Sequence, residues 1–99
     1  MQTINWSERL PGGKLVERGI ADFQSARRTV EACLIHIARS RLVRAGLIQE
    51  TNIAKLPDAE LELYRLLRLE KGDAYSRYNA LLRELVSFEN ALDRLTSDL

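Results

Sequence analysis

A chain of 99 residues with 45% hydrophobic and 29% charged side chains can bury a core of its own, so the composition excludes a disordered chain. The formal net charge of +1 at pH 7 argues against bulk nucleic acid or an anionic membrane as the dominant partner. No stretch reaches the ~20 apolar residues of a membrane span. The first residues lack the basic-then-apolar order of a signal peptide, so we expect neither a membrane span nor a signal peptide.

Cys33 is the one cysteine of the chain, so no disulfide can form within it. A lone thiol is ordinary in a reducing cytoplasm and unusual in a secreted protein. We therefore expect a cytoplasmic protein.

Residues 1–12 predict an irregular arm that precedes a single helical-bundle domain at 13–99. Pro11–Gly13 interrupts the backbone, because proline lacks an N–H donor and glycine is costly in regular structure. A helix should begin directly after this interruption. The apolar residues of the arm, which we expect to lie across the bundle, are Ile4, Trp6 and Leu10.

The next segment predicts one long helix from Lys14 to about Arg39. Its apolar residues recur at alternating steps of three and four, the spacing of one helix face. A glycine inside a helix costs about 1 kcal/mol relative to alanine, so Gly19 on this seam indicates that a neighbouring helix comes close there. The seam positions are Val16, Gly19, Phe23, Ala26, Val30, Cys33 and Ile37.

The seam of this helix fails near Ser40. A continuing helix would put Arg41 and Arg44 on the buried side, and an uncompensated buried charge is too costly. We therefore expect a bend there, followed by a short helical turn up to Ala45 that Gly46 closes in a left-handed conformation.

A polar connection from Leu47 to Lys55 leads to a second, shorter helix. This helix should begin near Pro57, with Asp58 as its N-cap, and end at Gly72. Acidic residues come early in it and basic residues come late, as the helix dipole favours.

The last quarter of the chain, Asp73–Leu99, carries the clearest helical seam. Asp73 is placed to cap this third helix, and Arg77 four residues later is placed to pair with it. The seam widens near its beginning, where two neighbouring helices are expected, through Tyr75, Leu82 and Val86. The seam itself comprises Tyr78, Leu81, Leu85, Phe88, Leu92, Leu95 and Leu99.

These elements together predict an all-α fold, a small helical bundle of two long antiparallel helices plus one shorter helix and a short helical turn. The shorter helix carries more leucine than one face can bury, since Leu61 and Leu69 point away from its other leucines, next to Arg65. An exposed apolar face commonly marks an interface. We therefore predict a non-enzymatic interaction module, either a homodimer or a protein that docks on another protein, with these three residues at the interface.

Basic residues gather around the predicted bend and suggest an alternative function. Arginine presents a planar fork that suits phosphate and carboxylate groups, so the alternative is a small regulator that contacts nucleic acid or another anion. Basic side chains near a helix C-terminus also stabilise the helix by themselves, and no aromatic residues alternate with these to stack on bases. The predicted anion contacts are Arg39, Arg41, Arg44 and Lys55, with Arg27 and Arg28 earlier in the chain.

Cys33 and His36, one helical turn apart, are candidates for a metal pair or an activated thiol. A zinc site needs three or four ligands, and the chain has no further histidine or cysteine. We therefore interpret both residues as structural, and we predict no cofactor, no metal and no catalytic residue.

A polar and aromatic group at the start of the third helix suggests one more pocket. Tyr75, Tyr78 and Asn79 could line it together with His36 and Arg39. Tyrosines at the edge of a core are explained as well by packing, and we favour that explanation.

Overall fold

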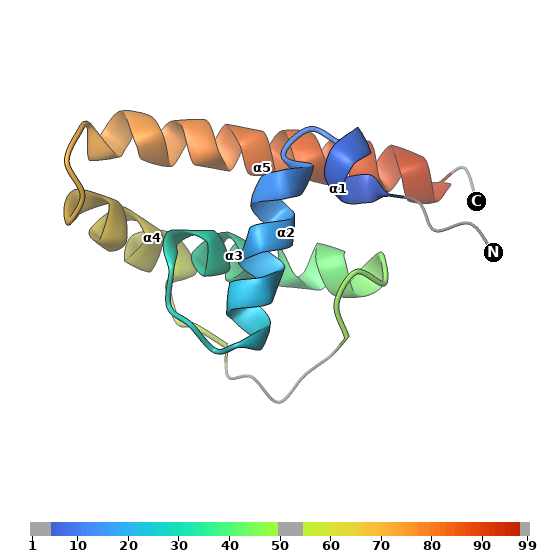
Figure 1. Ribbon diagram of the computed structural model, residues 1–99, viewed down its shortest axis with the longest axis horizontal. Helices are drawn as coiled ribbons and strands as arrows, with labels where there is room; N and C mark the ends of the chain where they lie inside the picture. Colours follow the sequence, from blue (N-terminus) through green and yellow to red (C-terminus); the bar gives the residue numbers. More distant parts are fainter. Residues whose placement is uncertain (1–4, 50–54, 98–99) are drawn as a thin grey trace.

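The computed structural model describes residues 5–49 and 55–97 of the chain. These residues fold into helices, with no β-strand among them (Figure 1). The all-α prediction is therefore confirmed, but the pair of long antiparallel helices is wrong, because α5, with 24 residues, has no partner of similar length in the described chain. The helices are α1 (Trp6–Arg9), α2 (Gly13–Gln24), α3 (Val30–Arg44), α4 (Ala59–Arg68) and α5 (Ala74–Ser97).

The N-terminal arm contains one helical turn, α1. The Trp6 ring packs edge-on against Phe88 of α5, with 5.6 Å between the ring centroids, and Leu10 also packs against the core. Both side chains therefore lie across the bundle as predicted, whereas Ile4 lies outside the described residues.

The predicted first long helix is two helices, because the chain turns at residues 25–29. α2 ends at Gln24, and Ala26 adopts a left-handed conformation with a φ of 59°. A right-handed helix cannot continue through this backbone conformation. Ala26 is therefore exposed in the turn rather than buried on a helical seam.

Thr29 caps the N-terminus of α3. Its hydroxyl oxygen accepts the Ala32 N–H at 3.1 Å and donates to the Asp22 carboxylate of α2 at 2.8 Å. One hydroxyl group thus satisfies a free N–H donor of α3 and joins α3 to the helix before it.

α3 runs without a break through the predicted bend to Arg44, so the bend and the separate helical turn are wrong. The turn at 25–29 resets the helical register, so that Leu42 is buried while Arg41 and Arg44 are exposed. The expected cost of burying these two charges therefore does not arise. Gly46 follows the helix with a φ of 81°, as predicted.

α2 crosses α3 at Gly19 (Figure 1). A Cβ atom at this position would lie 2.6 Å from the Glu31 carbonyl oxygen and 2.8 Å from the Ile35 side chain. The predicted close approach of a neighbouring helix at Gly19 is confirmed, because only a residue without a side chain allows this contact.

α5 extends along the length of the molecule and packs on both α3 and α4 (Figure 1). Its seam is confirmed where it is described, because Leu85, Phe88 and Leu92 are buried and Tyr78 packs beside them at the core edge. Leu99 lies outside the described residues. The core side chains that these residues meet from α2, α3 and α4 include Val16, Phe23, Leu34, Leu42, Leu63 and Leu67.

The ends of α4 differ from their prediction. Asp58 precedes the helix, but its φ is 50° and its side chain accepts no capping hydrogen bond, so the predicted N-cap bond is wrong. The helix ends at Arg68, before Gly72. Gly72 lies in the connection to α5, with a φ of 115°.

The N-terminus of α5 is capped as predicted. The Asp73 carboxylate accepts the Ser76 N–H at 3.2 Å and the Ser76 hydroxyl at 2.8 Å. The predicted pairing of Asp73 with Arg77 is wrong, because the Arg77 guanidinium pairs with Glu70 instead.

Candidate functional site

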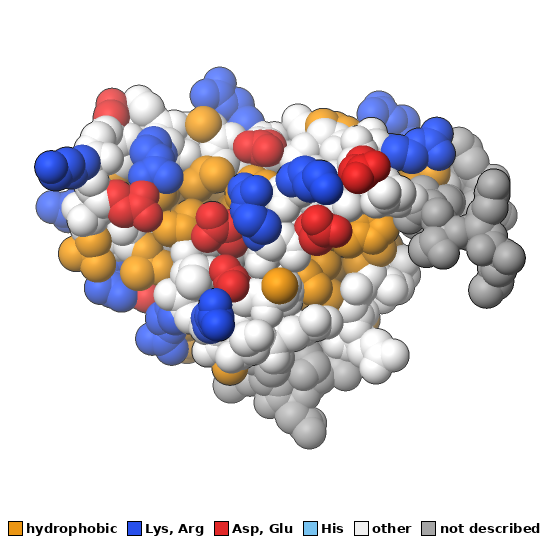
Figure 2. Space-filling model, in the orientation of Figure 1, with side chains coloured by type: hydrophobic (Ala, Val, Ile, Leu, Met, Phe, Trp, Pro, Cys, Tyr) orange, Lys and Arg blue, Asp and Glu red, His pale blue; other side chains and the backbone are white. Residues whose placement is uncertain are grey.

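The outer face of α4 carries two exposed leucines. Leu63 and Leu67 are buried on the inner face, whereas Leu61 and Leu69 keep 67% and 73% of their surface exposed. Together with Tyr64, Arg65 and Arg68, the exposed leucines line a shallow pocket, and we call these five residues the α4 outer face. On the side of the molecule in Figure 2, hydrophobic side chains gather over α4 and between α4 and α5, bordered by charged groups.

Arg65 is held at the centre of the α4 outer face. Its Nε and Nη2 atoms donate to the two carboxylate oxygens of Glu62 at 2.9 and 2.7 Å. The hydrogen bond from Arg65 lowers the pKa of the Glu62 carboxyl group. The guanidinium therefore lies along its own helix, already paired, between Leu61 and Leu69.

A second exposed apolar strip runs along α5. Tyr75 and Val86 are 66% and 50% exposed, so the prediction that both touch a second neighbouring helix is wrong for the single chain. Leu82 and Val86 line a shallow depression together with Asn79. The spacing of Tyr75, Leu82 and Val86 along one helix face is as consistent with an exposed strip as with a buried contact.

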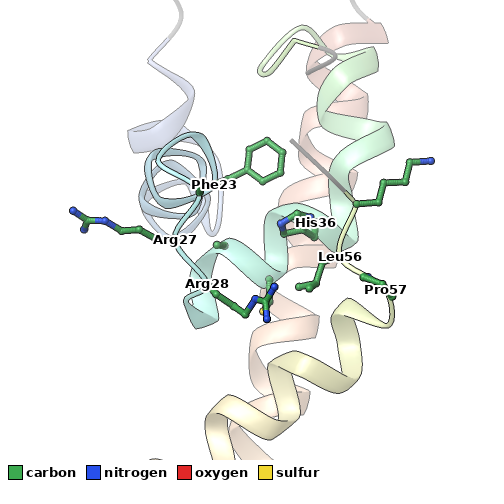
Figure 3. A pocket seen from close by; sticks show the side chains of 10 residues that line it. Phe23, Arg27, Arg28, His36, Leu56 and Pro57 are labelled. Carbon is green, nitrogen blue, oxygen red and sulfur yellow. The ribbon is translucent and has the colours of Figure 1, made fainter. Parts of the chain in front are cut away.

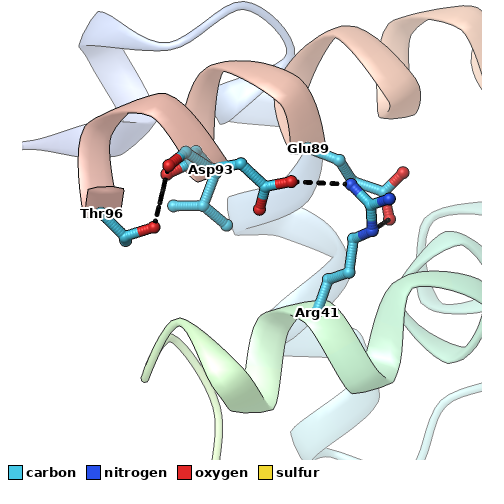
Figure 4. Close-up of polar contacts among 5 residues, drawn as sticks. Arg41, Glu89, Asp93 and Thr96 are labelled. Carbon is cyan, nitrogen blue, oxygen red and sulfur yellow. Dashed lines mark hydrogen bonds and ion pairs between the residues drawn. The ribbon is translucent and has the colours of Figure 1, made fainter. Parts of the chain in front are cut away.

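The four predicted anion contacts do not form one basic surface. Arg39 is buried, and its guanidinium carbon lies 5.5 Å from the centroid of the Phe23 ring. Arg41 reaches from α3 to α5, where it contacts Asp93 at 3.0 Å and Glu89 at 3.9 Å (Figure 4). Arg44 and Lys55 are exposed.

The contacts of Arg41 serve the packing of α3 on α5. Burial raises the pKa of the Glu89 carboxyl group, Arg41 opposes this change, and Asp93 adds to it. Thr96 donates a hydrogen bond to the Asp93 carbonyl oxygen at 3.2 Å (Figure 4). The positive charge of Arg41 is therefore balanced by carboxylates of α5 rather than presented to a ligand.

A pocket of about 260 Å³ opens between the C-terminal end of α2, the start of α3 and the segment before α4 (Figure 3). We call it the α2–α3 pocket. Phe23, Leu56 and Pro57 form apolar walls, and Cys33 and His36 line it from α3. Its basic lining residues are Arg27, Arg28 and Lys55.

His36 is a half-buried side chain with an unmet hydrogen bond. Its ring packs edge-on against Phe23, with 4.9 Å between the ring centroids. Its Nδ1 atom is buried and has no hydrogen-bond partner among the described residues. Burial, followed by the positive charges of Arg39 and Arg28, lowers the pKa of His36 from its ordinary value of 6.5.

Cys33 beside this histidine is fully buried and reduced. Burial, with a contribution from the Glu62 charge, raises the pKa of its thiol to about 11, against the opposing charges of Arg28 and Arg65. The thiolate is the nucleophilic form, so the thiol is unreactive at neutral pH and packs as a small apolar group.

The predicted pocket between the tyrosines and His36 does not form. Tyr78 packs edge-on against Tyr64 of α4 at 5.5 Å between centroids, and its hydroxyl lies 3.5 Å from a carboxylate oxygen of Glu60. His36 packs on Phe23 instead. Packing at the core edge therefore accounts for Tyr78.

Two further features are absent from the part of the chain that the structure describes. No three His, Cys, Asp or Glu side chains gather as a metal site would require. None of the helices in residues 5–49 and 55–97 combines the length and the apolar character needed to cross a bilayer.

We found no match to this chain among protein-family models, curated proteins or solved structures.

Proposed function

We propose that the protein is a non-enzymatic interaction module that self-associates through the α4 outer face. The observation that carries this proposal is the exposure of Leu61 and Leu69 on a helix whose inner leucines already fill the core. Fully burying a leucine stabilises an assembly by about 1.5–3 kcal/mol. Exposed leucines that face a common partner therefore favour association.

A second copy of the chain fits this face because α4 is complementary to itself. Its first turn is acidic, with Glu60 and Glu62, and its last turn is basic, with Arg65 and Arg68. Two copies of α4 packed antiparallel about a two-fold axis bring each acidic end next to the basic end of the other copy. Both apolar and ionic contacts then form twice.

A two-fold axis at Arg65 gives the best pairing. Leu61 and Leu69 lie four residues to either side of Arg65, so Leu61 of one copy faces Leu69 of the other. Arg68 then lies near the acidic first turn of the other copy. The two Arg65 side chains meet at the axis, but each is already neutralised by its own Glu62.

The test is the oligomeric state at two protein concentrations, measured by sedimentation velocity and native mass spectrometry. We expect a dimer for the native sequence and a monomer for the double variant Leu61→Gln, Leu69→Gln. The matched control is Val86→Gln, which changes an exposed apolar residue of α5 and should leave the dimer intact. A native protein that stays monomeric throughout would refute self-association and leave docking on a different protein.

The alternative of nucleic-acid contact through Arg39, Arg41, Arg44 and Lys55 has no specific observation in its favour. One of these side chains is buried and another is paired with carboxylates. Self-association also requires no catalytic residue, metal or cofactor.

A further inference from the structure

The α2–α3 pocket collects positive charge that no carboxylate balances by an ion pair. Arg27, Arg28 and Lys55 line it, and none of the three forms an ion pair among the described residues. Glu62 is near enough for Arg28 to lower its pKa, but the larger effect on it comes from Arg65, whose guanidinium occupies both of its oxygens. The charge of Arg28 therefore remains available to a ligand.

The view into the α2–α3 pocket separates the roles of these basic side chains. Figure 3 shows the Arg28 guanidinium beside Leu56 and below the His36 ring, whereas Arg27 extends away from both. Arg28 is thus the guanidinium placed to contact a bound group. Lys55 lines the same pocket from the segment before α4.

His36 places a titratable ring in the lining of the same pocket. A buried polar atom without a hydrogen-bond partner is uncommon in a folded protein and calls for an explanation. The Nδ1 atom of His36 is such an atom in the described chain, and its ring lines the pocket that holds Arg28. Because Nδ1 is closed off from solvent, an anion in the pocket acts on the ring through its charge rather than through a bond to this atom.

The remaining walls favour a ligand with an apolar body. Phe23, Leu56 and Pro57 line the pocket, and its volume of about 260 Å³ lies just below the range of ~300–1,000 Å³ for drug-sized ligands.

We propose that the α2–α3 pocket binds a small organic anion, a phosphate or carboxylate group on an apolar body. Arg28 holds the oxyanion beside the His36 ring, Lys55 adds a second positive charge to the lining, and Phe23 and Leu56 cover the apolar body. This site goes beyond self-association through α4, because it uses a different set of residues.

Binding of an anion is coupled to the charge of His36. Arg28 and Arg39 are the charged groups that act on the ring, and both disfavour its protonation, while the Cys33 thiol beside it is neutral. An anion between Arg28 and the ring reverses this effect and raises the pKa of His36. Affinity for the anion therefore increases as the pH falls through the pKa of His36.

The experiment is an NMR titration that follows the Hε1 proton of His36, the one histidine of the chain. The probes are phenyl phosphate and benzoate, with benzyl alcohol as the neutral control, added to the full-length protein at low ionic strength. We expect a saturable shift and a higher pKa of His36 with at least one anion, and neither with the alcohol. The probe that binds more tightly identifies phosphate or carboxylate as the preferred group.

Variants locate the binding within the pocket. Arg28→Gln should weaken anion binding about tenfold or more, since it removes a charge-assisted contact, while Arg68→Gln on the α4 outer face should leave it unchanged. Leu61→Gln with Leu69→Gln should also leave it unchanged, which separates this site from self-association. Any of three results would overturn the proposal. These are equal shifts with the alcohol and an anion, no saturable shift with either anion, and unchanged anion binding by a folded Arg28→Gln variant.

Discussion

Ala26 occupies a backbone conformation that normally selects glycine. Its N–H donates to the Phe23 carbonyl group, and the Arg27 N–H donates to that of Asp22 at 2.9 Å. These two bonds close the C-terminus of α2 in the Schellman arrangement, in which the left-handed residue is usually glycine. A left-handed conformation costs an L-residue roughly 1–2 kcal/mol.

Replacing Ala26 by glycine should stabilise the protein by about 0.5–1 kcal/mol, because the relief of strain exceeds the added entropy of the unfolded chain. Gly46→Ala is the matched control, since Gly46 has a φ of 81° and a Cβ atom there would meet nothing within 4 Å. It should destabilise by a similar amount. Urea unfolding measures both, and a destabilised Ala26→Gly would contradict the left-handed turn.

His36 makes the stability depend on pH. Its pKa is lowered in the folded protein from an ordinary value of 6.5, so the unfolded chain binds the proton more readily. The contribution to stability is complete above about pH 6.5 and is lost as the pH falls towards the lowered pKa of the folded state.

His36→Gln should therefore flatten the stability profile between about pH 7 and pH 5.5, as measured by urea unfolding at each pH. Glu89 acts in the opposite direction, because its raised pKa favours the folded state at lower pH. The effect of Glu89 is the same in the native protein and in His36→Gln, so it cancels when their stabilities are subtracted. Parallel profiles for the native protein and the variant would show that His36 is not responsible.

At the scale of one element, α4 has two working faces. Leu63 and Leu67 anchor it in the core, and Leu61 and Leu69 leave its outer face apolar. Acidic residues at one end and basic residues at the other stabilise the helix itself and also make it complementary to an antiparallel copy.

Reversing one charge on α4 tests this complementarity. In the proposed dimer, Arg68→Glu places a carboxylate near the acidic first turn of the second copy, so dimerisation should weaken about tenfold or more. Arg44→Glu, which changes an exposed arginine of α3, is the control and should have little effect. Sedimentation equilibrium measures the dimer dissociation constant of each variant. An equal loss of affinity in both would indicate an effect of net charge rather than of the α4 contact.

At the scale of the whole molecule, the proposed self-association predicts that stability depends on protein concentration. When only folded chains dimerise, the unfolding temperature rises as the protein concentration increases. The native protein should show this dependence in calorimetry, and the variant Leu61→Gln, Leu69→Gln should unfold at a temperature independent of concentration. A rise of the same size in both proteins would place the interface elsewhere.

Some features of the fold could be predicted because they depend on residues close in sequence. The Asp73 cap involves a residue three positions away, and the left-handed Gly46 follows from the lack of a side chain. The seam of α5 was equally readable from its spacing. The surplus leucines Leu61 and Leu69 were found in the same way, since one helix face cannot bury every leucine of α4.

The prediction of one long first helix was wrong because the three-four spacing reports only on residues close in sequence and does not show whether the helix is continuous. Val30 and Cys33 continue the three-four pattern of α2, although they belong to a separate helix. The helix is interrupted by the left-handed conformation of Ala26 together with the hydrogen bond from Thr29 to Asp22. Alanine carries no signal for a turn, so the register of α3 and the burial of Arg39 were also missed.

By itself, the sequence determined that the chain is helical, where α5 begins, and that α4 carries apolar residues on two faces. These properties follow from the chemistry and spacing of residues within a few helical turns. Only the tertiary structure decided that α2 crosses α3 at Gly19, that Arg41 pairs with carboxylates of α5, and that Arg28, His36 and Lys55 line one pocket. Each of these depends on contacts between segments far apart in sequence, which no local pattern contains.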